Sequence, residues 1–329
     1  MILAGDVGGT KCNLALFELR GGRLEPAVVR RYPSHDFEQF GQIVGKFLED
    51  ARAALGHDAG TLEAAGFGVA GPIVGRRVRA TNLPWIVDGS ALEQQLGTKK
   101  IVLLNDLEAT GYSLAHLRPE ELDTLNAGTP APRAAQALIA AGTGLGEAIL
   151  YWDGERYFVA SSEGGHADFA PHTDQEIELL RYMKKSNSCV SNELILSGRG
   201  FRTVHQFLDP SVKHPGLDDP AVDPAPQIAK QGLDGTCPVC VETLHLWIAI
   251  YGSEAGNLAL KALARNAVYV AGGIAVKILP KLKDGTFVRA FCDKSKLQPL
   301  LSQIPIHVVL NEQAPLLGAA SQAGAAARA

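Results

Sequence analysis

Short apolar runs and longer stretches with helical spacing follow one another along the chain, the pattern of a mixed α/β protein. Residues 1–5 and 12–17 are apolar, and Asp6-Val7-Gly8-Gly9-Thr10 separates them, so we expect a β-hairpin with a glycine tip. Residues 23–32 are expected to add a third strand. Apolar residues at helical spacing then predict a helix over about residues 36–54.

The next block predicts a strand at residues 65–70, a helix at 91–96 and a strand at 101–104. The last of these, Ile101-Val102-Leu103-Leu104, is a continuous apolar run, which is typical of a strand buried on both faces. It ends at Asn105-Asp106. The carboxyl end of such a strand is where an α/β sheet places functional groups.

The second half repeats the opening theme. Residues 137–141 are apolar, Gly142-Thr143-Gly144-Leu145-Gly146 forms a second glycine tip, and residues 148–152 continue as a strand. One glycine-tipped hairpin in each half indicates a duplicated architecture.

The remaining elements follow the same rules. Residues 209–235 are rich in Pro, Asp and Gly and are expected to form an irregular loop. A long helix is expected at about residues 238–264, and then a strand at 267–271 that ends in Gly272-Gly273. An Ala-rich helix is expected at residues 316–328.

Composition narrows the classes of function. At 329 residues the chain is long enough for two domains, and 46% hydrophobic with 20% charged residues is an ordinary folded composition. A net charge of −4 provides no basic field for a phosphate backbone, which argues against a nucleic-acid partner. We see neither a secretory leader nor an apolar run of about 18 residues. We therefore expect a cytoplasmic location and no membrane partner.

The five cysteines are scattered and odd in number, so a disulfide framework is not expected. Cys237 and Cys240 form a C-x-x-C pair, which suits half of a zinc site, a redox pair or a plain structural role. No second pair of matching His or Cys spacing follows it. We therefore expect no structural zinc.

The two glycine tips suit phosphate binding, because glycine lets backbone N–H groups approach an anion closely. Thr10 and Thr143 add hydroxyl donors. Either tip alone is more typical of a plain tight turn. The presence of both tips, each after an apolar strand, favours phosphate binding. A P-loop is excluded, since Gly45-Lys46 is followed by Phe47. The segment 66–71 fits G-x-G-x-x-G, but Pro72 and strand-like residues 73–78 follow it where a dinucleotide site needs a helix.

Polar candidates for catalysis and substrate binding lie outside these tips. Asp106 is either a general base or a helix cap. Glu163-Gly164-Gly165-His166-Ala167-Asp168 could bind sugar hydroxyls, although Glu163 also suits a polar turn and His166 a buried structural role. Glu193 is a functional acid, a residue on a solvated face or an acid in the first turn of a helix.

The motifs and their order along the chain resemble those of a known family. Over nearly its whole length the chain resembles the bacterial glucokinases of the sugar kinase, actin and heat-shock chaperone superfamily. The motifs that carry this resemblance are Gly5 to Thr10, Asn105-Asp106, Gly142 to Gly146, Glu163 to Pro171, Leu196-Ser197-Gly198 and Ala271 to Ile274. A related group carries a cysteine-rich zinc motif after its histidine element. Here Cys189 is the only cysteine between His166 and Cys237, so the resemblance is to the zinc-free group.

The resemblance implies an α/β fold of two ribonuclease-H-like (actin-like ATPase) domains with an interdomain cleft. The expected bounds are residues 1–111 with 314–329 for the small domain and 112–313 for the large one. It also implies MgATP as the phosphoryl donor. The implied nucleotide-binding residues are Gly5, Asp6, Val7, Gly8, Gly9, Thr10, Gly142, Thr143 and Gly144, with Gly272 and Gly273 beside the adenosine. Asp6 would hold Mg²⁺ through water.

For the sugar, the resemblance implies that Asn105, Glu163, His166 and Glu193 bind glucose hydroxyls and that Asp106 accepts the 6-hydroxyl proton. A homodimer is a further family expectation. The alternative is a sugar-sensing regulator on the same fold. Its DNA-binding form should carry a helix-turn-helix before the first hairpin, whereas five residues precede Asp6.

Overall fold

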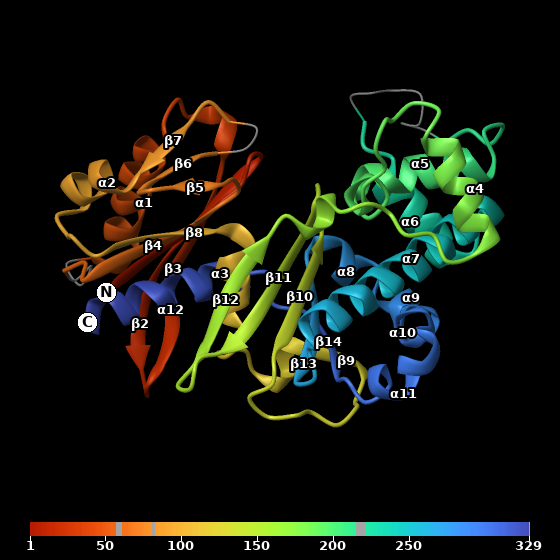
Figure 1. Ribbon diagram of the computed structural model, residues 1–329. Helices are drawn as coiled ribbons and strands as arrows, with labels where there is room; N and C mark the ends of the chain where they lie inside the picture. Colours follow the sequence, from red (N-terminus) through yellow and green to blue (C-terminus); the bar gives the residue numbers. More distant parts are fainter. Residues whose placement is uncertain (57–60, 81–82, 215–221, 329) are drawn as a thin grey trace. The chain divides into compact units, whose positions relative to one another are not determined.

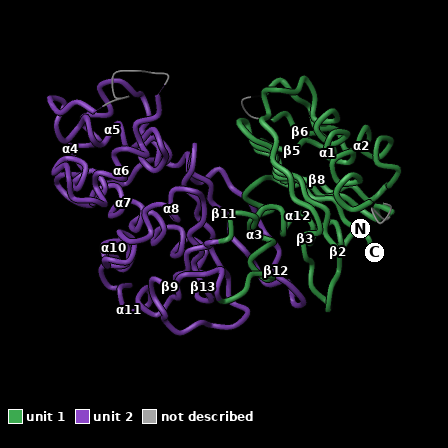
Figure 2. Tube along the Cα trace, turned by 180° about the vertical axis from the view of Figure 1, so that it is seen from behind, with its two compact units in different colours: residues 1–119, 311–329 green, residues 120–310 purple. Residues whose placement is uncertain are grey.

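The computed structural model describes residues 1–56, 61–80, 83–214 and 222–328. The chain divides into two compact units, Met1–Pro119 with Asn311–Ala329 as unit 1 and Glu120–Leu310 as unit 2 (Figure 2). The expected domain bounds, 1–111 with 314–329 and 112–313, stay a prediction. Among the described residues, no helix combines the length and apolar character that a bilayer crossing requires.

Unit 1 is built on a five-stranded sheet in the order β3-β2-β1-β4-β8. A small three-stranded sheet, β5-β6-β7, accompanies it. The elements are β1 (Ile2–Val7), β2 (Lys11–Arg20), β3 (Arg23–Pro33), α1 (Phe40–Leu55), β4 (Ala64–Val69), β5 (Ile73–Val74), β6 (Arg77–Arg79), β7 (Ile86–Asp88), α2 (Gly89–Leu96), β8 (Ile101–Asn105), α3 (Asp106–Ser113) and α12 (Ala314–Arg328) (Figure 1).

The strands of unit 1 bury alternate residues on opposite faces, as a pleated strand does. On β1, Leu3 and Val7 join one core with α1, while Ile2 and Ala4 join another with α3 and α12. The second core is lined by small side chains, so the α12 backbone approaches closely. An ideal Cβ at Gly66 would lie 2.2 Å from the Ala319 carbonyl oxygen. The C-terminal helix thus returns to the N-terminal unit, beside its strands (Figure 1).

Unit 2 is built on a six-stranded sheet in the order β12-β11-β10-β13-β14-β9. Helices form the connections from β12 to β13 and from β13 to β14. The long helix α7 packs in the core beside α5, α6 and α10. The strands are β9 (Leu122–Asn126), β10 (Gln136–Ala141), β11 (Leu145–Trp152), β12 (Tyr157–Ser162), β13 (Ala267–Ala271) and β14 (Ile306–Val309). The helices are η4 (Gly164–His166), α4 (Asp174–Met183), η5 (Asn192–Leu194), α5 (Gly198–Leu208), α6 (Ala225–Asp234), α7 (Pro238–Ala262), α8 (Gly273–Lys277), α9 (Leu279–Leu282), α10 (Thr286–Cys292) and α11 (Gln298–Leu301).

The predicted duplication is confirmed by the strand pairing. In unit 1, β1 pairs antiparallel with β2 and parallel with β4, which pairs parallel with β8. In unit 2, β10 pairs antiparallel with β11 and parallel with β13, which pairs parallel with β14. The two sheets therefore share one topology, and β9 adds an antiparallel edge to the second.

Three expectations are corrected. The apolar run 101–104 does not form a strand buried on both faces, because β8 is an edge strand on which Leu104 alone is buried. The loop expected over 209–235 contains helix α6, while residues 215–221 within it lie outside the described chain. Residues 73–78 form no single strand, since β5 and the start of β6 divide them.

Candidate functional site

The unit 1 candidates lie at the carboxyl edge of three parallel strands. The register pairs Val7 of β1 with Val69 of β4, and Val69 with Asn105 of β8. The β1–β2 glycine turn and the start of α3 therefore share one edge of the sheet. Gly68 permits this approach, because an ideal Cβ there would lie 2.9 Å from the Ala109 side chain.

Asp6 is held by a polar chain that the sequence analysis did not identify. Asn13, its partner in the β1–β2 register, donates from Nδ2 to Asp6 Oδ2 at 2.9 Å. Arg31 donates from Nε to Asn13 Oδ1 at 3.0 Å. Burial raises the pKa of Asp6, the Asn13 hydrogen bond opposes this, and the negative charge of Asp106 raises the pKa further. The carboxylates of Asp6 and Asp106 are therefore close enough to interact electrostatically.

The turn between β1 and β2 presents backbone donors. Its shape is fixed by the Gly8 N–H, which donates to the Lys11 carbonyl at 3.1 Å, and by the Ser34 hydroxyl, which donates to the Gly8 carbonyl at 2.8 Å. Within the ranges that the structure describes, the N–H groups of Gly9 and Thr10 have no hydrogen-bond acceptor. Such oriented N–H groups suit an anion.

Helix α3 begins with Asn105 as its N-cap and Asp106 as its first residue. The N-cap is Asn105, whose Oδ1 accepts from the N–H groups of Leu107 and Glu108, and the reading of Asp106 as the cap is wrong. Asp106 is the first helical residue. Its Oδ1 accepts from the Leu107 N–H at 2.9 Å, which orients the carboxylate.

In unit 2, β10 and β13 bring two glycine segments to one sheet edge. Ala140 pairs with Ala271 in register, so Gly142 and Gly272 follow adjacent strand ends. Gly272 has a φ of +91°, and an ideal Cβ there would lie 2.4 Å from the Ala141 carbonyl oxygen. This position requires glycine. The turn at Gly142 is closed by its N–H, which donates to the Gly144 carbonyl at 2.8 Å.

The carboxylate of Glu193 connects the glycine turn to the histidine motif. Its Oε2 accepts from the Leu145 N–H at 3.0 Å, and its Oε1 lies 3.6 Å from Nε2 of His166. Nδ1 of His166 lies 3.5 Å from Oε2 of Glu163. The structure therefore brings Glu163, His166 and Glu193 together from η4 and η5.

The exposed fraction of each side chain tests the alternatives for these three residues. The His166 side chain is 61% exposed, so its reading as a buried structural histidine is wrong. Glu193 lies in the first turn of η5, as one reading expected. Its side chain is 32% exposed and accepts from the Leu145 N–H, so the reading as a residue on a solvated face is wrong. Glu163 is 83% exposed, so both its readings, sugar ligand and polar turn, stay open.

Known proteins share this sequence and fold. A sequence model of the family described as Glucokinase matches residues 3–326. The chain is 40% identical to a glucokinase of a Nostoc species, with 97% of this chain and 98% of the relative covered. It is 38% identical to a glucokinase of Synechocystis, with 97% and 96% covered. The solved glucokinase of an Antarctic psychrotroph has a TM-score of 0.85 at 28% identity, with 98% of each chain covered.

These likenesses and the repeated strand order define a kinase fold of two actin-like ATPase-type domains, and the predicted fold class is confirmed. The chain belongs to the glucokinase family.

Proposed function

We propose that this protein transfers the γ-phosphoryl group of MgATP to the 6-hydroxyl of glucose, giving glucose 6-phosphate and ADP. The observation that carries the proposal is that each unit has at least one carboxylate close to its own glycine turn. In unit 1 these are Asp6 and Asp106, and in unit 2 Glu193 bonds the residue after Gly144. Membership of the glucokinase family supports the substrate pair.

In this proposal Asp106 accepts the proton of the 6-hydroxyl and orients that oxygen for attack. Phosphoryl transfer depends mostly on positioning and on charge neutralisation, so an oriented carboxylate is sufficient as the base. The hydrogen bond from the Leu107 N–H fixes one of its oxygens. A base within hydrogen-bond reach of the hydroxyl contributes about 10²–10⁴-fold to the rate.

The sugar is bound by Asn105, Glu163, His166 and Glu193. Because the side-chain Oδ1 of Asn105 caps α3, the Nδ2 group of the same side chain is the part that donates to a sugar hydroxyl. Glu193 keeps one oxygen for the Leu145 N–H and offers the other, with His166, to the sugar. A site built from such paired polar groups discriminates against analogues that lack a hydroxyl.

The nucleotide is bound by the segment Gly5, Asp6, Val7, Gly8, Gly9 and Thr10, by Gly142, Thr143 and Gly144, and by Gly272 and Gly273. The free N–H groups of Gly9 and Thr10 are directed at phosphate oxygens. Oxygen donors such as the Asp6 carboxylate suit Mg²⁺ bound through water. When bound, Mg²⁺ neutralises charge on the phosphates.

The test incubates the purified chain with glucose, ATP and Mg²⁺ and identifies the products by phosphorus NMR. Glucose 6-phosphate and ADP are expected in equal amounts, with no product when Mg²⁺ is omitted. Tight glucose binding without phosphate transfer would instead support the sugar-sensing regulator. A panel of hexoses and of phosphoryl donors, compared by kcat/KM, defines the specificity. The homodimer and the cytoplasmic location stay predictions.

A further inference from the structure

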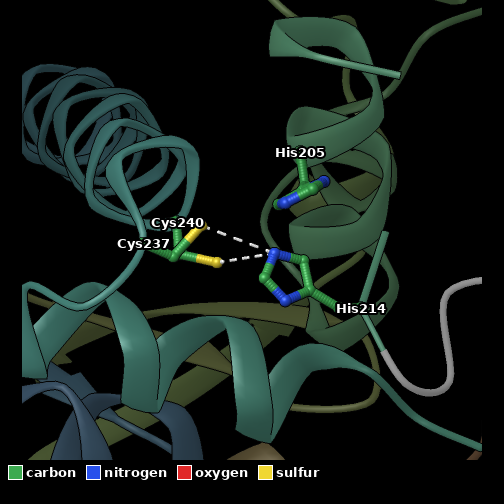
Figure 3. Close-up of side chains that lie close together, drawn as sticks. All are labelled: His205, His214, Cys237 and Cys240. Atoms are coloured by element: carbon green, nitrogen blue, oxygen red, sulfur yellow. Dashed lines mark hydrogen bonds between the residues drawn. The ribbon is translucent and has the colours of Figure 1, made fainter. Parts of the chain in front are cut away.

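Two histidines and two cysteines, none of them assigned above to substrate, converge in unit 2. His205 lies in α5, His214 follows that helix, Cys237 is the N-cap of α7 and Cys240 lies in its first turn. One ligand atom from each, two imidazole nitrogens and two sulfurs, lies within 4.8 Å of every other. Figure 3 shows His214 turned toward both sulfurs and His205 projecting from its helix toward the same space.

The two distances from His214 to the sulfurs match those of a tetrahedral zinc site. Nε2 of His214 lies 3.5 Å from the Cys237 sulfur and 3.4 Å from the Cys240 sulfur (Figure 3). With Zn–S near 2.3 Å and Zn–N near 2.0–2.1 Å, ligands at the tetrahedral angle lie about 3.6 Å apart. Sulfur and nitrogen at this spacing are therefore already at ligand separation.

The second observation is an orphaned imidazole. His205 is fully buried, and neither ring nitrogen has a hydrogen-bond partner among the described residues. A buried polar group without a partner costs free energy, which a metal–nitrogen bond would offset.

The donor set identifies the metal and the kind of site. Thiolate and imidazole ligands select zinc over Mg²⁺ or Ca²⁺, which prefer oxygen. Four protein ligands leave no position open for water or substrate, as in structural sites. A redox pair would need neither histidine.

We propose that His205, His214, Cys237 and Cys240 bind one structural zinc ion. The ion cross-links the end of α5 to the start of α7 and links His214 to Cys237, which are 23 positions apart in the sequence. The first residue of α5, Gly198, donates its N–H to the Gly142 carbonyl at 2.9 Å. The cross-linked helix therefore also supports the glycine turn of unit 2.

This proposal departs from the sequence-based expectation of no structural zinc. That expectation rested on the absence of a second ligand pair after Cys240. The two histidines precede the cysteines instead, and their spacing, His-x8-His followed by x22 and C-x-x-C, matches no common zinc pattern.

The test measures metal content and metal-dependent stability of the full chain. The protein, purified without an affinity tag or chelator, is expected to contain one zinc per chain by mass spectrometry. Removal of zinc should lower the melting temperature, and one equivalent of zinc should restore it. Cobalt in its place should give the strong visible absorption of a tetrahedral, thiolate-bound ion.

Variants separate a built site from adventitious binding. Cys237→Ser and His205→Ala should each weaken zinc binding by about 100-fold or more, since each removes one of four ligands. Cys292→Ser and Cys189→Ser, which remove thiols outside the cluster, should keep one zinc per chain. If the ligand variants do not fold, the wild-type cobalt spectrum and zinc titration decide alone. A wild-type chain that binds no zinc with its thiols reduced, or that holds a Cys237–Cys240 disulfide, overturns the proposal.

Discussion

Glu193 lies with one carboxylate oxygen 3.6 Å from Nε2 of His166 and the other 3.0 Å from the Leu145 backbone nitrogen. The same side chain therefore contacts a residue proposed to bind sugar and the turn proposed to bind phosphate. Any change that moves Glu193 should affect both substrates. This position follows from the absence of a side chain at Gly144, where an ideal Cβ would lie 2.4 Å from Glu193 Oε2.

Gly144→Ala is expected to reduce kcat/KM for glucose by displacing Glu193. The loss of one hydrogen bond to a charged group costs about 1.5–3 kcal/mol, which corresponds to roughly 10- to 150-fold. Steady-state kinetics with glucose and with ATP varied in turn measure this loss. A double-mutant cycle with Glu193→Ala is the control, because the alanine at 144 should cost little once the carboxylate is gone. Fully additive losses would show that Gly144 acts in some other way.

Asn13→Ala is expected to move the acidic limb of the kcat/KM profile to higher pH. The amide of Asn13 lowers the pKa of Asp6, so its removal lets burial and Asp106 raise that pKa further. Asp6, the proposed ligand of hydrated Mg²⁺, is then protonated at a higher pH than in the wild type. Asn187→Ala, which removes an amide bonded to the Met183 carbonyl in unit 2, should leave the limb in place. An unmoved limb in Asn13→Ala would exclude this role of Asp6.

Glu147→Gln is expected to stabilise the protein at alkaline pH. Burial, and then the charge of Glu254, raises the pKa of Glu147 from its ordinary 4.5 to about 7. The folded chain thus holds a proton that the unfolded chain has lost, and this stability, complete below pH 4.5, is lost as the pH rises through 7. The neutral glutamine avoids that loss.

The measurement is the difference in melting temperature between Glu147→Gln and wild type, which should be larger at pH 8.5 than at pH 5.5. Glu155→Gln, at an exposed turn position of the same unit, should show no such trend. A difference that stays constant across this range would contradict a protonated Glu147.

Gly318→Ala is expected to destabilise unit 1, although alanine normally favours a helix over glycine by up to about 1 kcal/mol. An ideal Cβ at Gly318 in α12 would lie 1.7 Å from the Ala109 carbonyl oxygen in α3. The helices must separate, at a cost of typically 1–3 kcal/mol. Gly45→Ala in α1, whose nearest neighbour would lie 3.8 Å away, is the matched control and should be neutral or stabilising. Thermal unfolding of both variants makes the comparison.

Hydropathy and glycine patterns predict the repeated framework well, because they report local chemistry. The glycine tips at 8–9 and 142–144 and the strand at 267–271 are confirmed. They mark the sheet edges where the candidate residues lie. The strand at 101–104 was expected to be buried on both faces, because an apolar run cannot reveal that β8 is an edge strand on which Leu104 alone is buried.

Contacts between distant segments are what the sequence cannot supply. The link from Asn13 to Asp6 depends on the β1–β2 register, and a lone asparagine in a strand gives no signal of it. The Pro-rich composition around residues 215–225 obscures helix α6, although Pro at a helix start is a recognised sign. His205 meets Cys240 only because α5 and α7 pack together.

The most direct test of the catalytic account compares Asp106→Asn with Asp174→Asn. Both replace an aspartate that is the first residue of a helix, so both change the same local helix electrostatics. Glucose phosphorylation is measured for each, with glucose affinity by calorimetry. We predict that Asp106→Asn loses at least about 10²-fold in kcat and still binds glucose, while Asp174→Asn keeps both. Wild-type turnover in Asp106→Asn would contradict the assignment of Asp106 as the base.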